Sequence, residues 1–250
     1  MTTTIARHPS AASTAPARPA AAAAAARVDL YATIHKALRS FMMDTLFRVG
    51  RIDVHDDDDV AATLGQLHQL LDLCSAHITH ENQFVHAAID ARRADGAART
   101  SAEHADHLHS IAALHEEAGA LRHAAAGQRQ APALRLYRHL ALFVAENFQH
   151  MHIEETVNNT LLWTLYSDAE LIEILERIHA HVTPQQHLLV ARWLVPAVSP
   201  MERSMILSSI KTQTPPEALL GVLASVRPHL DDRAWARLAP SLGVLPTLFR

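Results

Sequence analysis

His77-Ile-Thr-His-Glu81 and His150-Met-His-Ile-Glu154 share one pattern, in which a glutamate follows a histidine by four residues. Residues four apart lie on one face of an α-helix, one turn from each other. An imidazole and a carboxylate on the same face can bind one metal ion together, and two such helices that face each other can hold two ions. The repeated pattern therefore predicts two helices with a metal site between them.

Further histidines precede each copy of the pattern. His35 lies upstream of the first copy, and His104 and His107 lie upstream of the second. The chain therefore twice repeats the order of a histidine followed by His-x-x-x-Glu, which indicates an internal repeat. One such pattern alone would be weak evidence for a metal site, but two copies with a histidine before each rarely arise by chance.

Composition favours an all-helical protein. Of the 250 residues, 49% are hydrophobic and 5% are aromatic, glycine is scarce, and alanine and leucine are abundant. Helices suit this composition better than sheets do. Fourteen of the 19 histidines fall between His35 and His152. Because histidine is the commonest metal ligand among side chains, we expect the chemistry in this half of the chain.

Charge and cysteine content argue against several classes of protein. The formal net charge is -4 and the chain has no basic stripe with interleaved aromatic residues, so we expect no nucleic-acid partner. Cys74 is the only cysteine, which excludes an intramolecular disulfide and favours a reducing, cytoplasmic location. No apolar run reaches the ~20 residues that a transmembrane helix requires, so we expect no membrane partner.

Apolar residues at helical spacing divide the chain into segments. Residues 1–27, rich in alanine and proline, are predicted to form a disordered tail. Four long helices are expected over residues 28–49, 60–91, 101–126 and 134–165. Short connections between successive helices predict an up-down four-helix bundle that spans residues 28–165, with its core built from inward-facing residues.

The last third of the chain carries a series of helix-start signals. We expect residues 166–250 to form a C-terminal layer of four or five short helices that packs on the bundle. Four segments match the capping box, in which a serine or threonine precedes a glutamate or glutamine by three residues, and a fifth helix should begin near Asp231. The four capping-box segments start at Ser167, Thr183, Ser199 and Thr214.

With these motifs the chain resembles the hemerythrin-like, or HHE cation-binding, family over roughly residues 28–165. The resemblance implies a four-helix bundle with a non-haem site for two iron ions, able to bind dioxygen or to react with it. It also implies that the two glutamates bridge the ions. The residues that match the family's metal ligands are His35, His77, Glu81, His150 and Glu154.

The third-helix ligand remains open between His104 and His107. Oxygen-carrying hemerythrins have two histidines four residues apart there, but Leu108 stands where the second would be. Equal spacing of the two repeats favours His107, whereas the local sequence around His104 resembles the family's third helix better. His104 and His107 are three apart and could share one helix face, so both are candidate ligands.

The end of the fourth helix also departs from the oxygen carriers. Those proteins place an aspartate five residues after the histidine, whereas this chain has Glu154 at four and Glu155 at five. This difference favours the broader HHE group over reversible oxygen carriage. Histidine and carboxylate ligands suit iron, manganese or zinc, and the lack of thiolate ligands argues against copper(I) or an iron–sulfur cluster.

Side chains near these motifs have simpler interpretations. Tyr31, one turn before His35, could approach the metals but more often such a residue packs in the core. Seven further histidines are expected at the surface or in support of the ligands: His80, His86, His109, His115, His123, His139 and His152.

The leading hypothesis is a di-iron protein that senses or binds dioxygen, redox state or iron. Its ligand would be dioxygen or a related small molecule, and the C-terminal helices could bind a protein partner. The sequence leaves enzymatic activity open and favours a non-catalytic role. The alternative is a di-iron enzyme, namely an oxidase, a peroxidase or a nitric-oxide-processing protein. A second alternative is a structural helical interaction module without metal.

Overall fold

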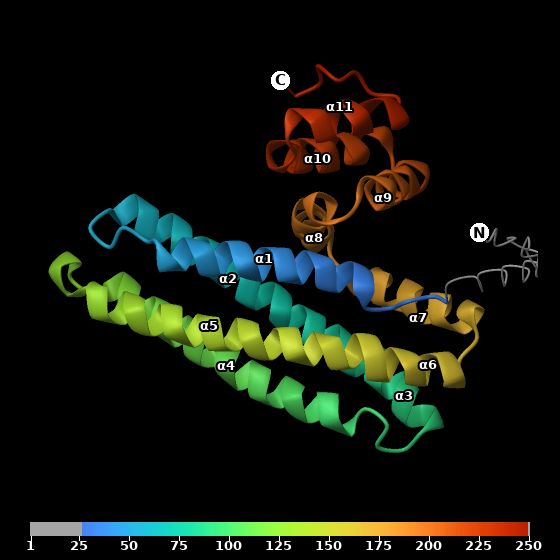
Figure 1. Ribbon diagram of the computed structural model, residues 1–250, viewed down its shortest axis with the longest axis horizontal. Helices are drawn as coiled ribbons and strands as arrows, with labels where there is room; N and C mark the ends of the chain where they lie inside the picture. Colours follow the sequence, from blue (N-terminus) through green and yellow to red (C-terminus); the bar gives the residue numbers. More distant parts are fainter. Residues whose placement is uncertain (1–26, 250) are drawn as a thin grey trace, which may run out of the picture.

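The computed structural model describes residues 27–249, and in this range every regular element is a helix (Figure 1). The predicted tail therefore lies outside the described residues except for Arg27. The Arg27 guanidinium binds Asp168 at 2.6 Å and donates to the carbonyl oxygens of Trp163 and Tyr166. The last residue of the predicted tail is thus tied to the folded part of the chain.

Four long helical segments pack side by side, each antiparallel to its neighbours (Figure 1). The segments are α1 (Ala32–Gly50); α2 (Asp57–His80) with η1 (Glu81–His86) and α3 (Ala87–Arg92); α4 (Ala98–His123); and α5 (Gln130–Ile153) with η3 (Glu154–Asn158) and α6 (Asn159–Leu165). α1 packs against α2 and α5, and α4 packs against the same two helices on the other side. All four predicted helices are present.

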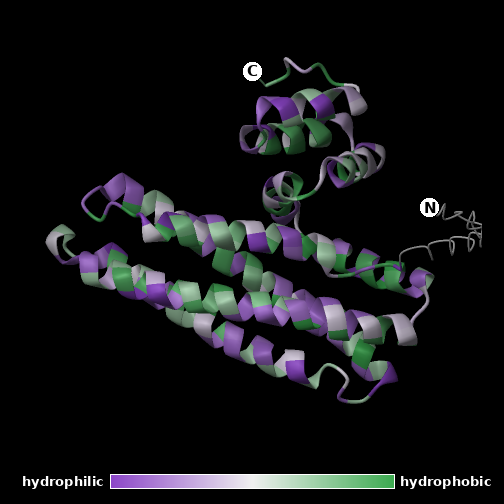
Figure 2. Ribbon diagram, in the orientation of Figure 1, coloured by the Kyte–Doolittle hydropathy of each residue, from purple (hydrophilic) through white to green (hydrophobic). Residues whose placement is uncertain are grey.

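The four segments share one core of apolar side chains at helical spacing. Figure 2 shows that hydrophobic residues recur along each segment. Phe41, Leu67, Leu114 and Leu140 are fully buried in it. Burial of one such side chain stabilises the fold by about 1.5–3 kcal/mol. Gly50, at the end of α1, allows close packing, because a Cβ atom there would lie 2.9 Å from the ring of Tyr137.

Side-chain caps set the helix starts. Asp29 accepts hydrogen bonds from the backbone N–H groups of Tyr31 and Ala32, so the first helix begins four residues later than predicted. Asp56 caps α2 by accepting from the N–H groups of Asp58 and Asp59. Capping of this kind satisfies donors that have no partner inside the helix.

Two π-helical turns interrupt the long helices, and the sequence did not predict them. η1 begins at Glu81 and η3 begins at Glu154, the two glutamates of the repeated pattern. A π-turn accommodates one more residue than an α-turn and so shifts which side chains share a face. Such turns occur frequently at functional sites.

The C-terminal helices begin largely as predicted. They are α7 (Asp168–His181), α8 (Pro184–Ala197), α9 (Pro200–Gln213), α10 (Pro216–Val226) and α11 (Asp232–Ser241). Complete capping boxes are present at Ser167, Thr183 and Ser199, and Asp231 caps α11. The predicted box at Thr214 is wrong. The N-cap of α10 is Pro215, and the Thr214 hydroxyl instead donates to the carbonyl oxygen of Ile210.

This C-terminal segment packs on the bundle through its first two helices. α8 packs against α1, and α7 contacts η1. The indole of Trp193 on α8 stacks on the ring of Phe41, with 4.2 Å between ring centroids and 12° between planes. α9, α10 and α11 stand beyond α8 (Figure 1) and share a second apolar core that includes Leu207, Leu223 and Trp235.

Candidate metal centre

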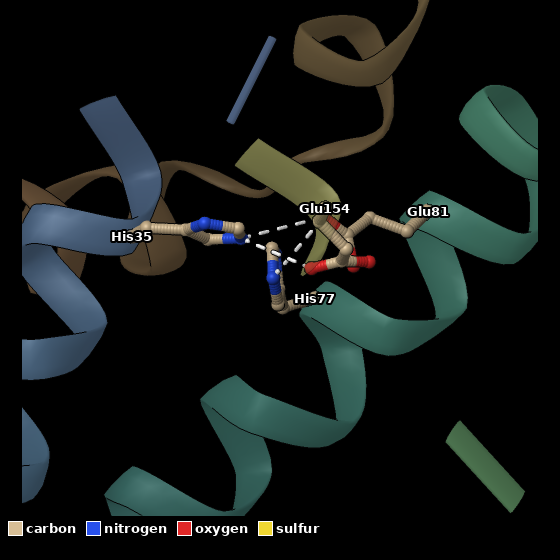
Figure 3. Close-up of side chains that lie close together, drawn as sticks. All are labelled: His35, His77, Glu81 and Glu154. Atoms are coloured by element: carbon tan, nitrogen blue, oxygen red, sulfur yellow. Dashed lines mark ion pairs between the residues drawn. The ribbon is translucent and has the colours of Figure 1, made fainter. Parts of the chain in front are cut away.

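Six histidine and glutamate side chains from all four helical segments meet inside the bundle. They form two groups of four, and within each group the candidate ligand atoms all lie within 4.8 Å of one another. Both groups contain Glu81 and Glu154. Figure 3 shows the first group, in which the labelled side chains point toward one another. The first group is His35, His77, Glu81 and Glu154, and the second is Glu81, His104, His150 and Glu154.

In the first group the two histidines share the facing oxygens of the glutamates. His77 Nε2 lies 3.3 Å from Glu81 Oε1, one helical turn away. His35 Nε2 lies 3.7 Å from the same oxygen and 3.4 Å from Glu154 Oε2. The imidazole nitrogens and carboxylate oxygens therefore converge on one point (Figure 3).

In the second group the histidines face the other oxygens of the same carboxylates. His104 Nε2 lies 3.3 Å from Glu81 Oε2 and 3.6 Å from Glu154 Oε1. His150 Nε2 lies 3.2 Å from Glu154 Oε1 and 2.9 Å from His104 Nε2. Each glutamate thus presents one oxygen to each group, which is the arrangement of a carboxylate that can bridge two cations.

The centre is buried and several of its polar atoms have no hydrogen-bond partner. His35, Glu81, His104, His150 and Glu154 are at most 5% exposed. The buried atoms without a partner include Nε2 of His35 and of His77, Oε2 of Glu81 and both carboxylate oxygens of Glu154. Buried polar atoms left unpaired are costly, and native structures contain few of them. Since these atoms are the ones that converge, metal ions would fit the residues present.

Electrostatics hold both carboxylates in the charged form. Burial and the charge of Glu154 raise the pKa of Glu81, but His77, His104 and His35 outweigh them and bring it to about 2. Burial also raises the pKa of Glu154, yet the neighbouring imidazoles of His104 and His150 hold it well below its usual value. Two adjacent carboxylates that stay ionised favour a cation between them.

The histidines of the centre differ in their pKa values. Burial lowers the pKa of His104, but Glu154 and Glu81 outweigh it and raise the pKa to about 9. Burial likewise lowers the pKa of His35, but the neighbouring glutamates outweigh it and raise the pKa well above its usual value. Burial dominates for His77 and lowers its pKa to about 4, so that this imidazole is neutral. Only a neutral imidazole offers a metal the required lone pair, so metal ions would have to displace protons from the other histidines.

The far nitrogen of three histidines is fixed by an oxygen acceptor. His35 Nδ1 donates to Glu155 Oε1 at 3.0 Å, and the same oxygen accepts from Arg39 at 2.6 Å. Glu155, five residues after His150, therefore supports His35 and joins neither group. Hydrogen bonds of this kind fix the tautomer and orientation of an imidazole that binds a metal.

The second group has equivalent supports. His104 Nδ1 donates to Asn82 Oδ1 at 2.8 Å, and His150 Nδ1 donates to Glu103 Oε2 at 2.8 Å. Each donation leaves Nε2 of the ring directed at the centre. Sequence reasoning did not identify Asn82 or Glu103, because their contacts join helices that are distant in the chain.

His107 is buried beside the centre but joins neither group. Its ring lies 4.9 Å from that of His150, edge to face, and its Nδ1 has no hydrogen-bond partner. Burial, together with His150 and His104, lowers its pKa to about 4. Leu108, where the oxygen carriers have a second histidine, is 40% exposed and faces outward. The geometry thus places His104, rather than His107, among the converging side chains.

His86, expected at the surface or in support of the ligands, lies beside the centre. Its Nε2 is 3.7 Å from Glu154 Oε1, and its ring stacks on that of His104 with 4.8 Å between centroids. His86 follows Glu81 by five positions, and in an α-helix two side chains at this spacing would lie on different faces. The π-turn brings both side chains to the same face, and the helical pattern gave no sign of that turn.

Tyr31 is buried next to the first group. Its ring centroid lies 5.4 Å from that of His35, the side chain is 1% exposed and the hydroxyl has no hydrogen-bond partner. Burial and the charges of Glu154 and Glu81 raise its pKa well above the usual value. Tyr31 therefore packs in the core and also keeps a protonated hydroxyl close to the centre.

The other histidines expected at the surface or as supports lie outside both groups. His109 and His123 donate from Nδ1 to backbone carbonyl oxygens of their own helix. His115 stacks on His68 and His139 contacts Glu117, both away from the six converging residues.

Comparison of the chain with family models, with curated proteins and with solved structures found no significant match. Across residues 27–249, none of the helices combines the length and apolar character that crossing a bilayer requires. The geometry of the centre itself is therefore the basis for a function.

Proposed function

We propose that this protein binds two iron ions in a non-haem centre of hemerythrin-like type and senses or binds dioxygen, redox state or iron. In this proposal the up-down bundle belongs to the hemerythrin-like class. His35 and His77 hold the first ion, His104 and His150 hold the second, and the two glutamates bridge them. Manganese or zinc could replace iron in the same donor set.

One observation carries the proposal. Glu81 presents Oε1 to the first group and Oε2 to the second, and Glu154 presents Oε2 to the first and Oε1 to the second. A single structural ion would not need both oxygens of both carboxylates. Two bridging carboxylates lower the repulsion between two cations, which supports a dinuclear centre.

Iron in such a centre would supply electrons and a coordination position for dioxygen or a related small ligand. The chain's own residues would orient the imidazoles through Glu155, Asn82 and Glu103 and would exclude bulk water. Among the six proposed ligands His77 is the most exposed, at 13% of its side chain, so the first ion is the more accessible of the two. This accessibility suits a sensor that responds to a diffusible ligand.

The alternative is a di-iron enzyme, and Tyr31 is the observation that favours it. A buried, protonated hydroxyl near a metal centre can donate a hydrogen bond or a proton to a ligand on that metal. Turnover of peroxide or nitric oxide that is lost in Tyr31→Phe while the metal content is retained would favour the enzyme over the sensor.

The test is the metal content of the purified protein, measured by elemental analysis together with visible spectra in air and after anaerobic reduction. About two irons per chain are expected in the wild type, with absorption that depends on oxygen. The double variant His77→Ala/His150→Ala should hold none, whereas His109→Ala/His123→Ala, which alters two exposed histidines, should match the wild type. A double variant at His77 and His150 that retains its iron would contradict the proposal. If the wild-type chain takes up no metal, the remaining hypothesis is a structural interaction module.

A further inference from the structure

A cavity of about 250 Å³ lies between the bundle and the first two C-terminal helices. Side chains from α1, α2 and η1 form one wall, and side chains from α7 and α8 form the other. The first wall includes His77 and Glu81, both of which belong to the candidate metal centre. The cavity therefore reaches the first group from the side that the C-terminal segment covers.

Most of the lining is apolar. It includes Leu30, Ile34, Leu73, Val85, Ile178 and Val190. Among the polar lining residues, Glu81 is buried and His77 is half-buried where the cavity reaches the metal centre. The remaining polar residues are half-buried or exposed: Asp29, Thr33, His80, His179, Gln186 and His187. A few polar groups in a largely apolar cavity are typical of sites that bind small organic molecules.

The volume of the cavity indicates which ligands it can hold. An engineered apolar cavity of roughly 150 Å³ is large enough to bind benzene. A cavity of about 250 Å³ is larger than a diatomic gas requires and can hold roughly ten non-hydrogen atoms by the same scaling. The volume of the cavity therefore points to an organic ligand rather than to dioxygen alone.

We propose that this cavity is a binding site for a small, neutral, mainly apolar organic molecule whose one polar group faces His77 and Glu81, beneath a roof formed by α7 and α8. The cavity's apolar wall supplies the affinity, because burial of apolar surface is favourable and non-directional. The polar group of the ligand would lie beside the first metal ion, a part of the proposal that rests on the metal centre proposed above.

The C-terminal helices then have a defined role. Ile178 on α7 and Val190 on α8 close the cavity, and Trp193 anchors α8 to Phe41 on α1. Without this segment His77 and the apolar residues around it would face solvent. The docked segment thus has a function in forming the site, and the ligand is an organic molecule that the centre senses.

The probe for the test is 4-fluorophenol, with fluorobenzene as its apolar counterpart, and binding is followed by ¹⁹F NMR on the full chain. Val190→Trp places a large ring in the cavity and should weaken probe binding by at least about tenfold. Leu188→Trp places the same ring at a position of α8 that is 39% exposed and should bind as the wild type does. Ala76→Leu fills the cavity from α2 and provides a second variant if Val190→Trp does not fold.

Ligand binding in the cavity and the ligand's position beside the metal have separate readouts. Binding to the metal-free protein tests the cavity, whereas broadening of the probe signal by paramagnetic iron, absent with zinc, tests its position beside the centre. Probe binding that is equal in wild type, Val190→Trp and Ala76→Leu, or absent from the wild type, would overturn the cavity site. Bound probe that iron does not broaden would overturn the position next to the metal. Failure of the chain to take up metal would refute only the metal centre.

Discussion

Glu155 accepts a hydrogen bond from His35 Nδ1 at 3.0 Å and thereby joins α1 to the π-turn that follows α5. Glu154, the preceding residue, faces the centre with both carboxylate oxygens. Two adjacent glutamates therefore have different roles, one beside the proposed metals and one behind an imidazole. This relationship explains why the chain has a carboxylate both four and five residues after His150.

Replacement of Glu155 by glutamine should weaken metal binding without removing a ligand. The amide keeps the shape but no longer provides a charged acceptor for His35, so we expect a loss of about 10–100-fold in affinity for the first ion. Competition with a metal-binding dye measures the affinity. Glu146→Gln alters an exposed glutamate of α5 and serves as the control. Equal affinity in the two variants would show that the hydrogen bond does not tune the centre.

Metal uptake should release protons and weaken as the pH falls. His104 has a pKa raised to about 9, and the pKa of His35 is raised well above its usual value, so both are protonated in the metal-free protein near neutral pH. Glu81, with a pKa of about 2, is already ionised and contributes no proton. Binding must therefore displace histidine protons, and affinity should rise with pH while these histidines lose their protons.

Calorimetric titrations in buffers of different ionisation enthalpy measure the released protons. A binding enthalpy that is independent of the buffer would mean that the histidines are already neutral, contrary to the electrostatics of the centre. The double variant His77→Ala/His150→Ala provides the baseline for nonspecific metal binding.

Alanine variants of His104 and His107 should separate the two candidates on the third helix. His104 lies in the second group and His107 does not, so His104→Ala should reduce the metal content by about one ion per chain and His107→Ala should retain both ions. Elemental analysis after reconstitution measures the difference. Retention of both ions in His104→Ala, together with loss in His107→Ala, would reverse the assignment.

Metal binding should stabilise the fold by mass action. At a free metal concentration of 100 times the dissociation constant the gain is about 2.7 kcal/mol for one site, provided that the unfolded chain does not bind. Thermal unfolding followed by circular dichroism should therefore show a higher midpoint with metal and a return to the original midpoint with chelator. A midpoint that rises equally in His77→Ala/His150→Ala would indicate binding elsewhere.

Removal of the Trp193 indole should loosen the C-terminal segment from the bundle. Trp193 is 8% exposed and stacks on Phe41, so Trp193→Ala should cost about 3–5 kcal/mol in the free energy of unfolding. Denaturant titration measures the loss, and Leu188→Ala on the exposed side of α8 is the control. Equal stability of these two variants would mean that the stacked pair does not hold α8 in place.

The sequence by itself determined the four long helices and the proximity of each histidine to its glutamate. Both follow from local periodicity, since residues four apart share a helix face whatever the rest of the chain does. The capping boxes at Ser167, Thr183 and Ser199 were equally local and therefore predictable. The capping box predicted at Thr214 was wrong because, with two consecutive prolines after Thr214, the helix starts one residue later.

Only the tertiary structure decided how the segments meet. Contacts between residues far apart in the chain bring His104, rather than His107, into the centre and place Glu155 against His35. Such contacts also bring His86 to Glu154 and form the cavity under α7 and α8. The π-turns at Glu81–His86 and Glu154–Asn158 set the faces of His86 and Glu155, because a π-turn shifts which side chains share a helix face. A repeat pattern specifies which residues can face one another, whereas packing and the π-turns determine which of them do.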